Sequence, residues 1–194
     1  MSDLDIAVSV ALGIGLAAAT GLRVFLPLLV VSAAAYSGHL PLADSFAWLG
    51  TPAALILLSV AAVVEILAYY IPGVDNLLDA LATPAALVAG TVVSAAVITD
   101  LPPTVKWATA VIAGGGIAGV MQSMTALLRA KSTVFTAGVG NPVLATSELA
   151  ASLLMSLLAL AAPLIALLLI VLFLWLALRL FLRVTRRSAP APEP

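Results

Sequence analysis

The sequence GVGNPVLATSE at residues 138–148 joins a glycine-rich turn to a helix start and then to a carboxylate. Proline is favoured at the first helical position because its missing backbone N–H needs no partner, and Asn141 before it can cap the first turn. Glu148 directly precedes an apolar run from Leu149 to Leu160. A charge inside a membrane span is costly unless it is paired or hydrated. The stretch therefore predicts a functional site within a membrane-spanning helix.

The composition indicates an integral membrane protein and excludes several other classes. Of the 194 residues, 63% are hydrophobic and 9% are charged, and the mean hydropathy is +1.24, whereas soluble domains carry about 25% charged residues. The net charge of −1 excludes a basic surface for nucleic acid, and the lack of cysteine excludes thiolate chemistry. A single histidine excludes a histidine-based metal cluster. We expect membrane lipids and an unidentified small solute or ion as partners, with no cofactor and no metal.

Six apolar segments approach or exceed the roughly 20 residues that a helix needs to cross a bilayer. The first, at about 6–36, is interrupted by TGLR at 20–23 and by Pro27, so we expect it to break there or to tilt steeply. The others are expected at about 52–71, 82–98, 105–128, 142–160 and 163–182. The sequence thus predicts an all-α membrane protein of about six helices. Residues 1–182 would form a single transmembrane domain, and residues 183–194 a basic, then Pro/Ala-rich, disordered cytoplasmic tail.

The basic residues predict the orientation. Arg129 and Lys131 follow the fourth segment, and four arginines between residues 179 and 187 flank the end of the sixth. With six spans both groups fall on one side, which the positive-inside rule makes cytoplasmic. We therefore expect both termini in the cytoplasm.

The two halves of the chain also suggest an internal repeat. A shift of 101 residues places 13–17 over 114–118, and a shift of 83 residues places Glu65 over Glu148. Repeats over 6–100 and 105–182 would each hold three spans, so the second would be inverted relative to the first. Such 3+3 inverted repeats, with a broken helix and a site near the midplane, are typical of many transporters.

Polar residues within the apolar segments are the candidate site for a solute or ion. These residues are Arg23, Glu65, Gln122, Asn141 and Glu148. Arg23 either extends to the headgroups or turns inward to pair with Glu65 or Glu148. Gln122 either joins helices or lines a pathway. The helix start at Asn141 is either simply capped or presents its positive end to an anion.

A second group, Asp75, Asn76 and Asp79, follows the turn at 72–76. It is either a solvated loop with a helix cap or a cation mouth on the cytoplasmic side. The four-residue spacing of the two aspartates also allows a metal site for an enzyme acting on a lipid, but the loop offers few partners for that chemistry, and no catalytic residue is predicted. The spacing of Gly115 and Gly119 permits close helix packing and hence a homodimer.

Three pieces of the sequence resemble a bacterial membrane family known as domain of unknown function 4126. They are TGLRVFLPLL at 20–29, the run from Glu65 through IPGVDN at 71–76 to Asp79, and GNP at 140–142 followed by Glu148. Family members commonly carry Asp-Lys before the Ile-Pro turn and Arg-Pro at the third span, where this chain has AYY at 68–70 and TP at 83–84. The resemblance covers about residues 8–175 and implies a bacterial inner-membrane protein. It supplies no established activity.

These observations favour a small inverted-repeat transporter or channel that moves a small solute or ion, with proton coupling through buried glutamates. The alternative is a membrane scaffold or lipid-binding protein in which the polar residues only hold helices together.

Overall fold

The structure, a computed structural model, describes residues 3–71, 73–99 and 101–187, and within these ranges the chain forms helices and no strand. The first half contains α1 (Asp3–Thr20), α2 (Phe25–Tyr36), the 3₁₀ helix η1 (Asp44–Gly50), α3 (Pro52–Ala68) and α4 (Val74–Val97). The second half contains α5 (Pro103–Thr109), the π-helix η2 (Ala110–Gly115), α6 (Gly116–Thr136), α7 (Asn141–Ala161) and α8 (Pro163–Arg187). The all-α prediction is confirmed.

Among the described residues, five helical stretches are long and apolar enough to cross a membrane: α1, α4, the continuous stretch from α5 through α6, α7, and α8 as far as Leu180. A sixth is obtained if η1 and α3, which are bent by 68° relative to each other, are counted as one span. The protein is therefore a multi-pass membrane protein with five or six spans, as predicted.

α1 is the helix around which the others pack, since it contacts α4, α6, α7 and α8. Small residues make this close approach possible. A Cβ on Gly13 would lie 3.2 Å from Ser94 Cα, and a Cβ on Gly15 would lie 2.8 Å from Ala159 Cβ. The Ser94 hydroxyl also donates to the Gly13 carbonyl at 2.9 Å. Alanine, glycine and serine at these contacts thus allow α1 to occupy the centre of the bundle.

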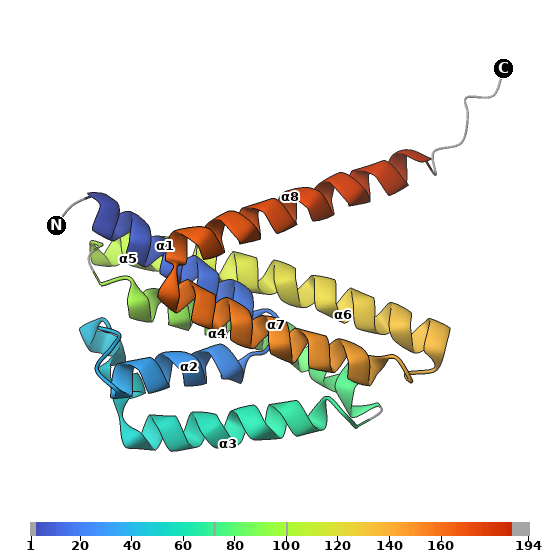
Figure 1. Cartoon of the computed structure of the whole chain (residues 1–194), viewed down its shortest axis with the longest axis horizontal. Coiled ribbons are helices and arrows are strands. Elements are labelled where there is room, and N and C mark those ends of the chain that lie inside the picture. The colour runs from blue at the N-terminus through green and yellow to red at the C-terminus, as the bar shows by residue number, and fades with distance from the viewer. Residues whose placement is uncertain (1–2, 72, 100, 188–194) are drawn as a thin grey trace.

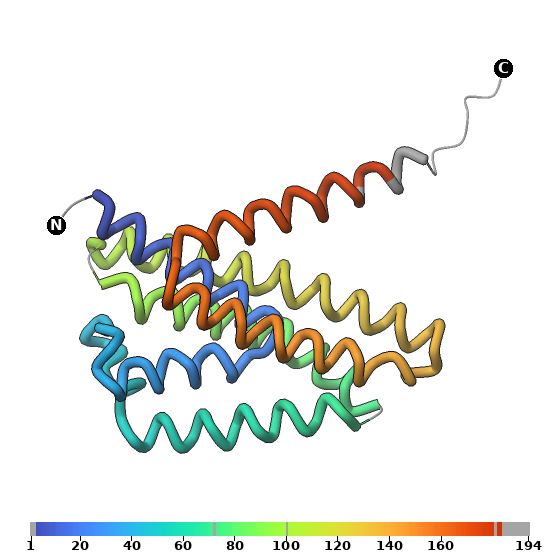
Figure 2. Tube along the Cα trace, in the orientation of Figure 1, coloured from blue at the N-terminus to red at the C-terminus, as the bar shows by residue number. Residues whose placement is uncertain are grey.

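The first apolar segment breaks where the sequence predicted. α1 ends at Thr20, four residues of link follow, and α2 returns toward the end of the bundle from which α1 began (Figure 1). The trace in Figure 2 shows the same reversal. A backbone hydrogen bond of 2.8 Å from Ala43 to Ala96 ties the segment after α2 to the end of α4. α1 and α2 therefore form a hairpin whose tip, residues 21–24, lies within the bundle.

This hairpin bears on the predicted placement of the termini. Because α2 comes back, α1 starts and α8 finishes at opposite ends of the bundle (Figure 1). The expectation that both termini lie in the cytoplasm stays a prediction, because the structure places the described ends of the chain relative to the bundle and not relative to a membrane. That expectation treated the first segment as one crossing, whereas α1 and α2 run in opposite directions. Residues 183–187 of the predicted tail continue α8, and residues 188–194 lie outside the described part of the chain.

The closely spaced glycines serve packing inside the chain. A Cβ on Gly115 would lie 2.5 Å from Thr91 Oγ1, and a Cβ on Gly119 would lie 2.5 Å from Leu87 Cδ2. Both contacts are with α4, so this spacing joins η2 and α6 to α4 and does not present a free dimerisation face. A homodimer remains a prediction without support from these glycines.

Candidate functional site

The link between α1 and α2 places the side chain of Arg23 in the interior of the bundle. Gly21 contributes because a side chain there would collide with the backbone carbonyl of Ala118 on α6. Non-helical backbone at membrane depth is tolerated only where protein or a water-filled cavity surrounds it. Arg23 follows directly, and its side chain is 1% exposed. Of the two orientations that the sequence allowed for Arg23, the structure therefore shows the inward one.

Arg23 contacts α7 and Tyr69, the residue that follows α3. Its Nη2 donates to the Ala145 carbonyl at 2.8 Å and lies 3.4 Å from Glu148 Oε2. Its guanidinium also stacks over the ring of Tyr69, 3.9 Å from the ring centroid. Of the two glutamates considered for Arg23, Glu148 is the one that forms the ion pair.

A second buried arginine, Arg129 on α6, completes the arrangement. Its Nη2 donates to the same Glu148 oxygen, and its Nε lies 2.9 Å from Asp79 Oδ2 on α4. It also lies over the Tyr69 ring, 4.5 Å from the centroid. The Tyr69 hydroxyl donates to Asp79 Oδ1 at 3.2 Å. We call these five residues the charge cluster: Arg23, Tyr69, Asp79, Arg129 and Glu148.

Sequence reasoning missed Arg129 by assigning it to a basic loop. One signal could have found it: Gln122, Thr125 and Arg129 are spaced by three and four residues, which places them on one face of a helix. All three are buried in the structure. Gln122, a predicted site residue, thus lies on the same face of α6 two turns before Arg129. Tyr69 was not predicted because a tyrosine near a helix end is ordinarily interfacial.

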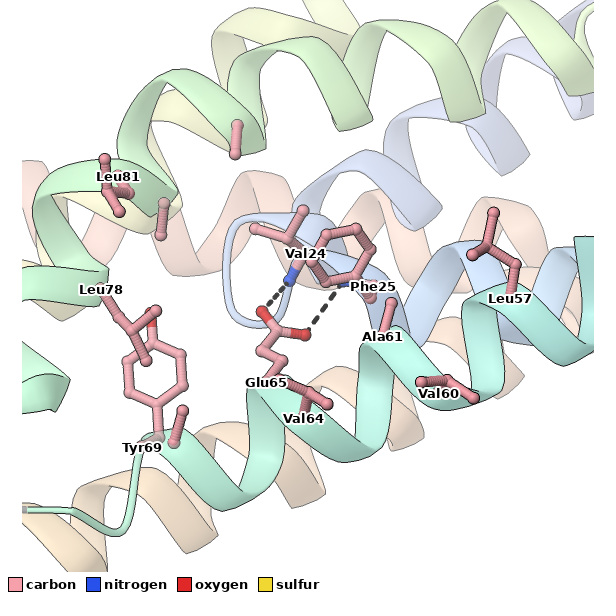
Figure 3. A pocket seen from close by; sticks show the side chains of 13 residues that line it. Val24, Phe25, Leu57, Val60, Ala61, Val64, Glu65, Tyr69, Leu78 and Leu81 are labelled. Atoms are coloured by element: carbon pink, nitrogen blue, oxygen red, sulfur yellow. Dashed lines mark hydrogen bonds between the residues drawn. The ribbon is translucent and has the colours of Figure 1, made fainter.

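Glu65 has a role different from the predicted ion pair. Its Oε1 accepts the Val24 N–H at 2.7 Å and its Oε2 accepts the Phe25 N–H at 3.0 Å (Figure 3). These N–H groups belong to the start of α2, where free donors and the helix dipole favour a negative charge. Glu65 therefore caps α2 and attaches α3 to the tip of the hairpin.

The predicted cytoplasmic mouth is a closed network. Asp75 is 1% exposed, and its Oδ1 accepts the N–H groups of Gly73 and Asn76, each at 2.9 Å. Asn141 donates its amide to Asp75 Oδ2 and, at 2.9 Å, to Thr133 Oγ1. The solvated-loop reading of Asp75 is therefore wrong, because α7 covers it. The start of α7 faces this carboxylate of the chain itself, which argues against a separate anion site there.

Asn76 stays in the Asp75 network, whereas Asp79 separates from it. The Asn76 amide oxygen accepts a weak hydrogen bond of 3.5 Å from Thr133. Asp79 turns to Arg129 and belongs to the charge cluster. Nowhere in the described ranges do three His, Cys, Asp or Glu side chains group as a metal site. The metal reading of the two aspartates therefore has no support here.

The guanidinium groups keep unused donors. Nε and Nη1 of Arg23 and Nη1 of Arg129 are buried without a hydrogen-bond partner in the part of the chain that the structure describes. A buried donor left without an acceptor costs about 1–3 kcal/mol. The charge cluster thus has capacity to bind further acceptor atoms.

Beside the charge cluster lies an apolar cavity of about 470 Å³ between α3 and α4. Glu65 and Tyr69 reach it from α3, opposite Leu78 and Leu81 of α4 (Figure 3). The other lining residues are aliphatic, apart from Phe25. The volume is in the range of ligand pockets, about 300–1,000 Å³.

Comparison with known proteins agrees with the resemblance noted in the sequence. The family described as "Domain of unknown function (DUF4126)" matches residues 10–183, which include every residue of the charge cluster. No curated protein and no solved structure matches the chain. The chain belongs to the family of domain of unknown function 4126.

Proposed function

We propose that the protein is a small membrane transport protein that carries an anionic solute, together with a proton, past the charge cluster. The observation that carries this proposal is the pair of buried arginines, Arg23 and Arg129, which share Glu148 and still have unpartnered donors. Guanidinium groups are well suited to bind carboxylate and phosphate oxygens through several donors at once. Glu148 would hold the arginines until a solute anion replaces it.

The charges of the cluster support proton coupling. Arg23 and Arg129 are balanced by Asp79 and Glu148, and Glu65 is paired with the start of α2. A bound anion adds one negative charge to a site that water does not reach freely. A proton taken up by Glu148 restores the balance and releases this carboxyl from the arginines. One proton would then move with each monovalent anion.

A scaffold role is the competing function. The charge cluster connects the α1–α2 link with α3, α4, α6 and α7, so it also fastens the bundle. The unused donors favour transport, because a cluster that served only stability would gain from pairing them or from replacing the charges with apolar residues. The predicted lipid-binding alternative is compatible with the apolar cavity.

The proposed setting is the inner membrane of a bacterium. The end of the bundle that holds Lys131 and Arg183 would face the cytoplasm, and the start of α1 would face the other side. Both residues are exposed near helix ends. The inverted repeat remains part of the proposal. It is supported by the opposite directions of α3 and α7, which hold the two equated glutamates (Figure 1), although Glu65 and Glu148 have different partners.

Transport can be tested in proteoliposomes loaded with a pH-sensitive dye, by imposing inward gradients of inorganic phosphate, acetate and octyl phosphate in turn. We expect at least one anion to acidify the lumen faster than it does in protein-free liposomes, which undissociated acetic acid crosses unaided. Glu148→Gln should slow acidification by about tenfold or more, the size of effect typical for loss of a proton-transfer group. Ser147→Ala, which changes an exposed neighbour on the same helix, should transport like the parent. Equal rates for the parent and Glu148→Gln, with both folded, would contradict the proposal.

A further inference from the structure

α3 and α4 are consecutive in the chain and yet pack poorly on each other. α3 packs mainly against α2 and η1, and α4 packs against α1, η2 and α6. In Figure 1, α3 lies at the edge of the bundle. The apolar cavity occupies the space that remains between the two helices.

The cavity opens toward lipid. Four of its lining residues are among the most exposed apolar side chains: Leu57 (67%), Val60 (58%), Val64 (59%) and Leu81 (62%). In a membrane-spanning chain, such side chains face hydrocarbon. A hydrocarbon chain can therefore enter from the bilayer without passing through water.

The inner end of the cavity is formed by Tyr69. One edge of this residue lines the cavity, and its ring supports the guanidinium groups of Arg23 and Arg129. Tyr69 follows the last residue of α3, and its side chain is held by the hydrogen bond to Asp79 at 3.2 Å and by the two guanidinium groups on its ring. Rotation of one side chain would therefore connect the cavity to the unused arginine donors.

The charge at this inner end favours an anion. Glu65 is the one carboxylate that lines the cavity, and both its oxygens are turned to the N–H groups of α2 (Figure 3). The donors left without partners belong to arginines. A cationic head would meet two guanidinium groups behind Tyr69, whereas a phosphate or carboxylate would find hydrogen-bond donors there.

We propose that the cavity between α3 and α4 binds the hydrocarbon chain of an anionic amphiphile, whose phosphate or carboxylate head reaches Arg23 and Arg129 when Tyr69 turns aside. This inference rests on the proposed transport function and assigns its substrate class. Tyr69 acts as the partition between the lipid-accessible cavity and the charge cluster.

Binding is tested with the full chain in phosphatidylcholine nanodiscs. Radiolabelled octyl phosphate is titrated, and uptake by empty discs is subtracted. The same titration uses octanol, octyltrimethylammonium and inorganic phosphate. We expect saturable binding of octyl phosphate at one site per chain, with affinity at least about tenfold above that of octanol, since charge-assisted hydrogen bonds to buried arginines add roughly 1.5–3 kcal/mol. Binding of inorganic phosphate should be weaker than that of octyl phosphate.

The variant Ala61→Phe fills the cavity from α3, and Val63→Phe is its matched control, because Val63 lies on the same helix, is exposed and does not line the cavity. Ala61→Phe should weaken octyl phosphate binding by about tenfold, the loss expected when about two methylene groups can no longer be buried. Val63→Phe should bind like the parent. Thermal unfolding of both variants verifies that they are folded.

Equal affinity for all three eight-carbon compounds, or preference for the cation, would overturn the assignment of an anionic head. Unchanged binding by Ala61→Phe would overturn the assignment of the cavity. Failure of the transport proposal is distinguishable: binding of octyl phosphate without any anion-driven acidification indicates a lipid-binding protein. Acidification by inorganic phosphate without binding of octyl phosphate indicates a carrier of small anions.

Discussion

Replacement of Arg129 by methionine tests whether the charge cluster is one coupled unit. Methionine keeps the apolar stem of the side chain and removes the guanidinium. Asp79 and Glu148 then both lose their contact with Arg129. Asp79 keeps only the Tyr69 hydroxyl at 3.2 Å, and Glu148 keeps only Arg23 at 3.4 Å.

The expected magnitude follows from these contacts. Breaking a buried ion pair by removing one partner costs about 3–5 kcal/mol, because the other charge remains buried and uncompensated. Asp79→Asn should cost less, since Arg129 still holds Glu148 and the amide fits the same space. In the double variant, Asp79→Asn removes the carboxylate that Arg129→Met alone would leave buried without its arginine. The double variant should therefore be more stable than the sum of the single effects predicts, by about 1–3 kcal/mol.

The free energy of unfolding is measured by reversible denaturation in mixed detergent micelles for the parent, both single variants and the double variant. Lys131→Met serves as the matched control, since it removes an exposed positive charge from the same helix. It should change stability by less than about 0.5 kcal/mol. Additivity of Arg129→Met and Asp79→Asn, within about 0.5 kcal/mol, would refute the coupling on which the cluster depends.

Three further variants separate the supporting contacts from the cluster. Glu65→Gln should lower the free energy of unfolding by about 1–2 kcal/mol, because the amide oxygen of glutamine can accept only one of the two N–H groups at the start of α2. Anion-driven acidification should persist in this variant. Loss of acidification while the variant is folded would contradict the capping role of Glu65. Asn141→Ala leaves Asp75 without its side-chain donor and should cost about 1–3 kcal/mol in thermal unfolding, so an unchanged melting temperature argues against the closed network. Gly114→Ala places a Cβ 2.7 Å from the carbonyl oxygen of Gly90 and should lower the free energy of unfolding by about 1–3 kcal/mol. Gly116→Ala is the control: its Cβ meets nothing within 4 Å, so the variant should be as stable as the parent or slightly more stable. Equal effects of the two substitutions would contradict the close packing of η2 on α4.

The segmentation of the chain could be predicted from the sequence because it depends on local properties. Runs of apolar residues set the spans, and TGLR at 20–23 marked the break in the first segment. The direction of α2 after the break depends on contacts distant in sequence, such as the hydrogen bond from Ala43 to Ala96. Residue patterns do not encode such contacts, so the sequence did not predict that α2 turns back toward the start of α1.

The candidate site could be predicted in part. A charge stranded in an apolar run stands out, and Arg23 and Glu148 were found in this way and do pair. Arg129 was missed because it lies near the end of its span, where a basic residue ordinarily faces headgroups. The partners of Glu65, the N–H groups of Val24 and Phe25, were not predicted because every non-proline residue has a backbone N–H and the sequence does not indicate which of them is free. The glycine spacing of η2 and α6 correctly indicated close helix contact, but the partner helix proved to be α4 of the same chain.

In the proposed transport cycle, a solute anion displaces Glu148 from Arg23 and Arg129 while Glu148 takes up a proton. Infrared difference spectroscopy of the reconstituted protein, with and without octyl phosphate, measures this protonation directly through the carbonyl stretch of a carboxylic acid. We expect this band to appear when the amphiphile binds, to be lost in Glu148→Gln and to be retained in Glu65→Gln. An unchanged carboxyl spectrum on saturable binding, or the same new band in Glu148→Gln, would contradict the proposed cycle.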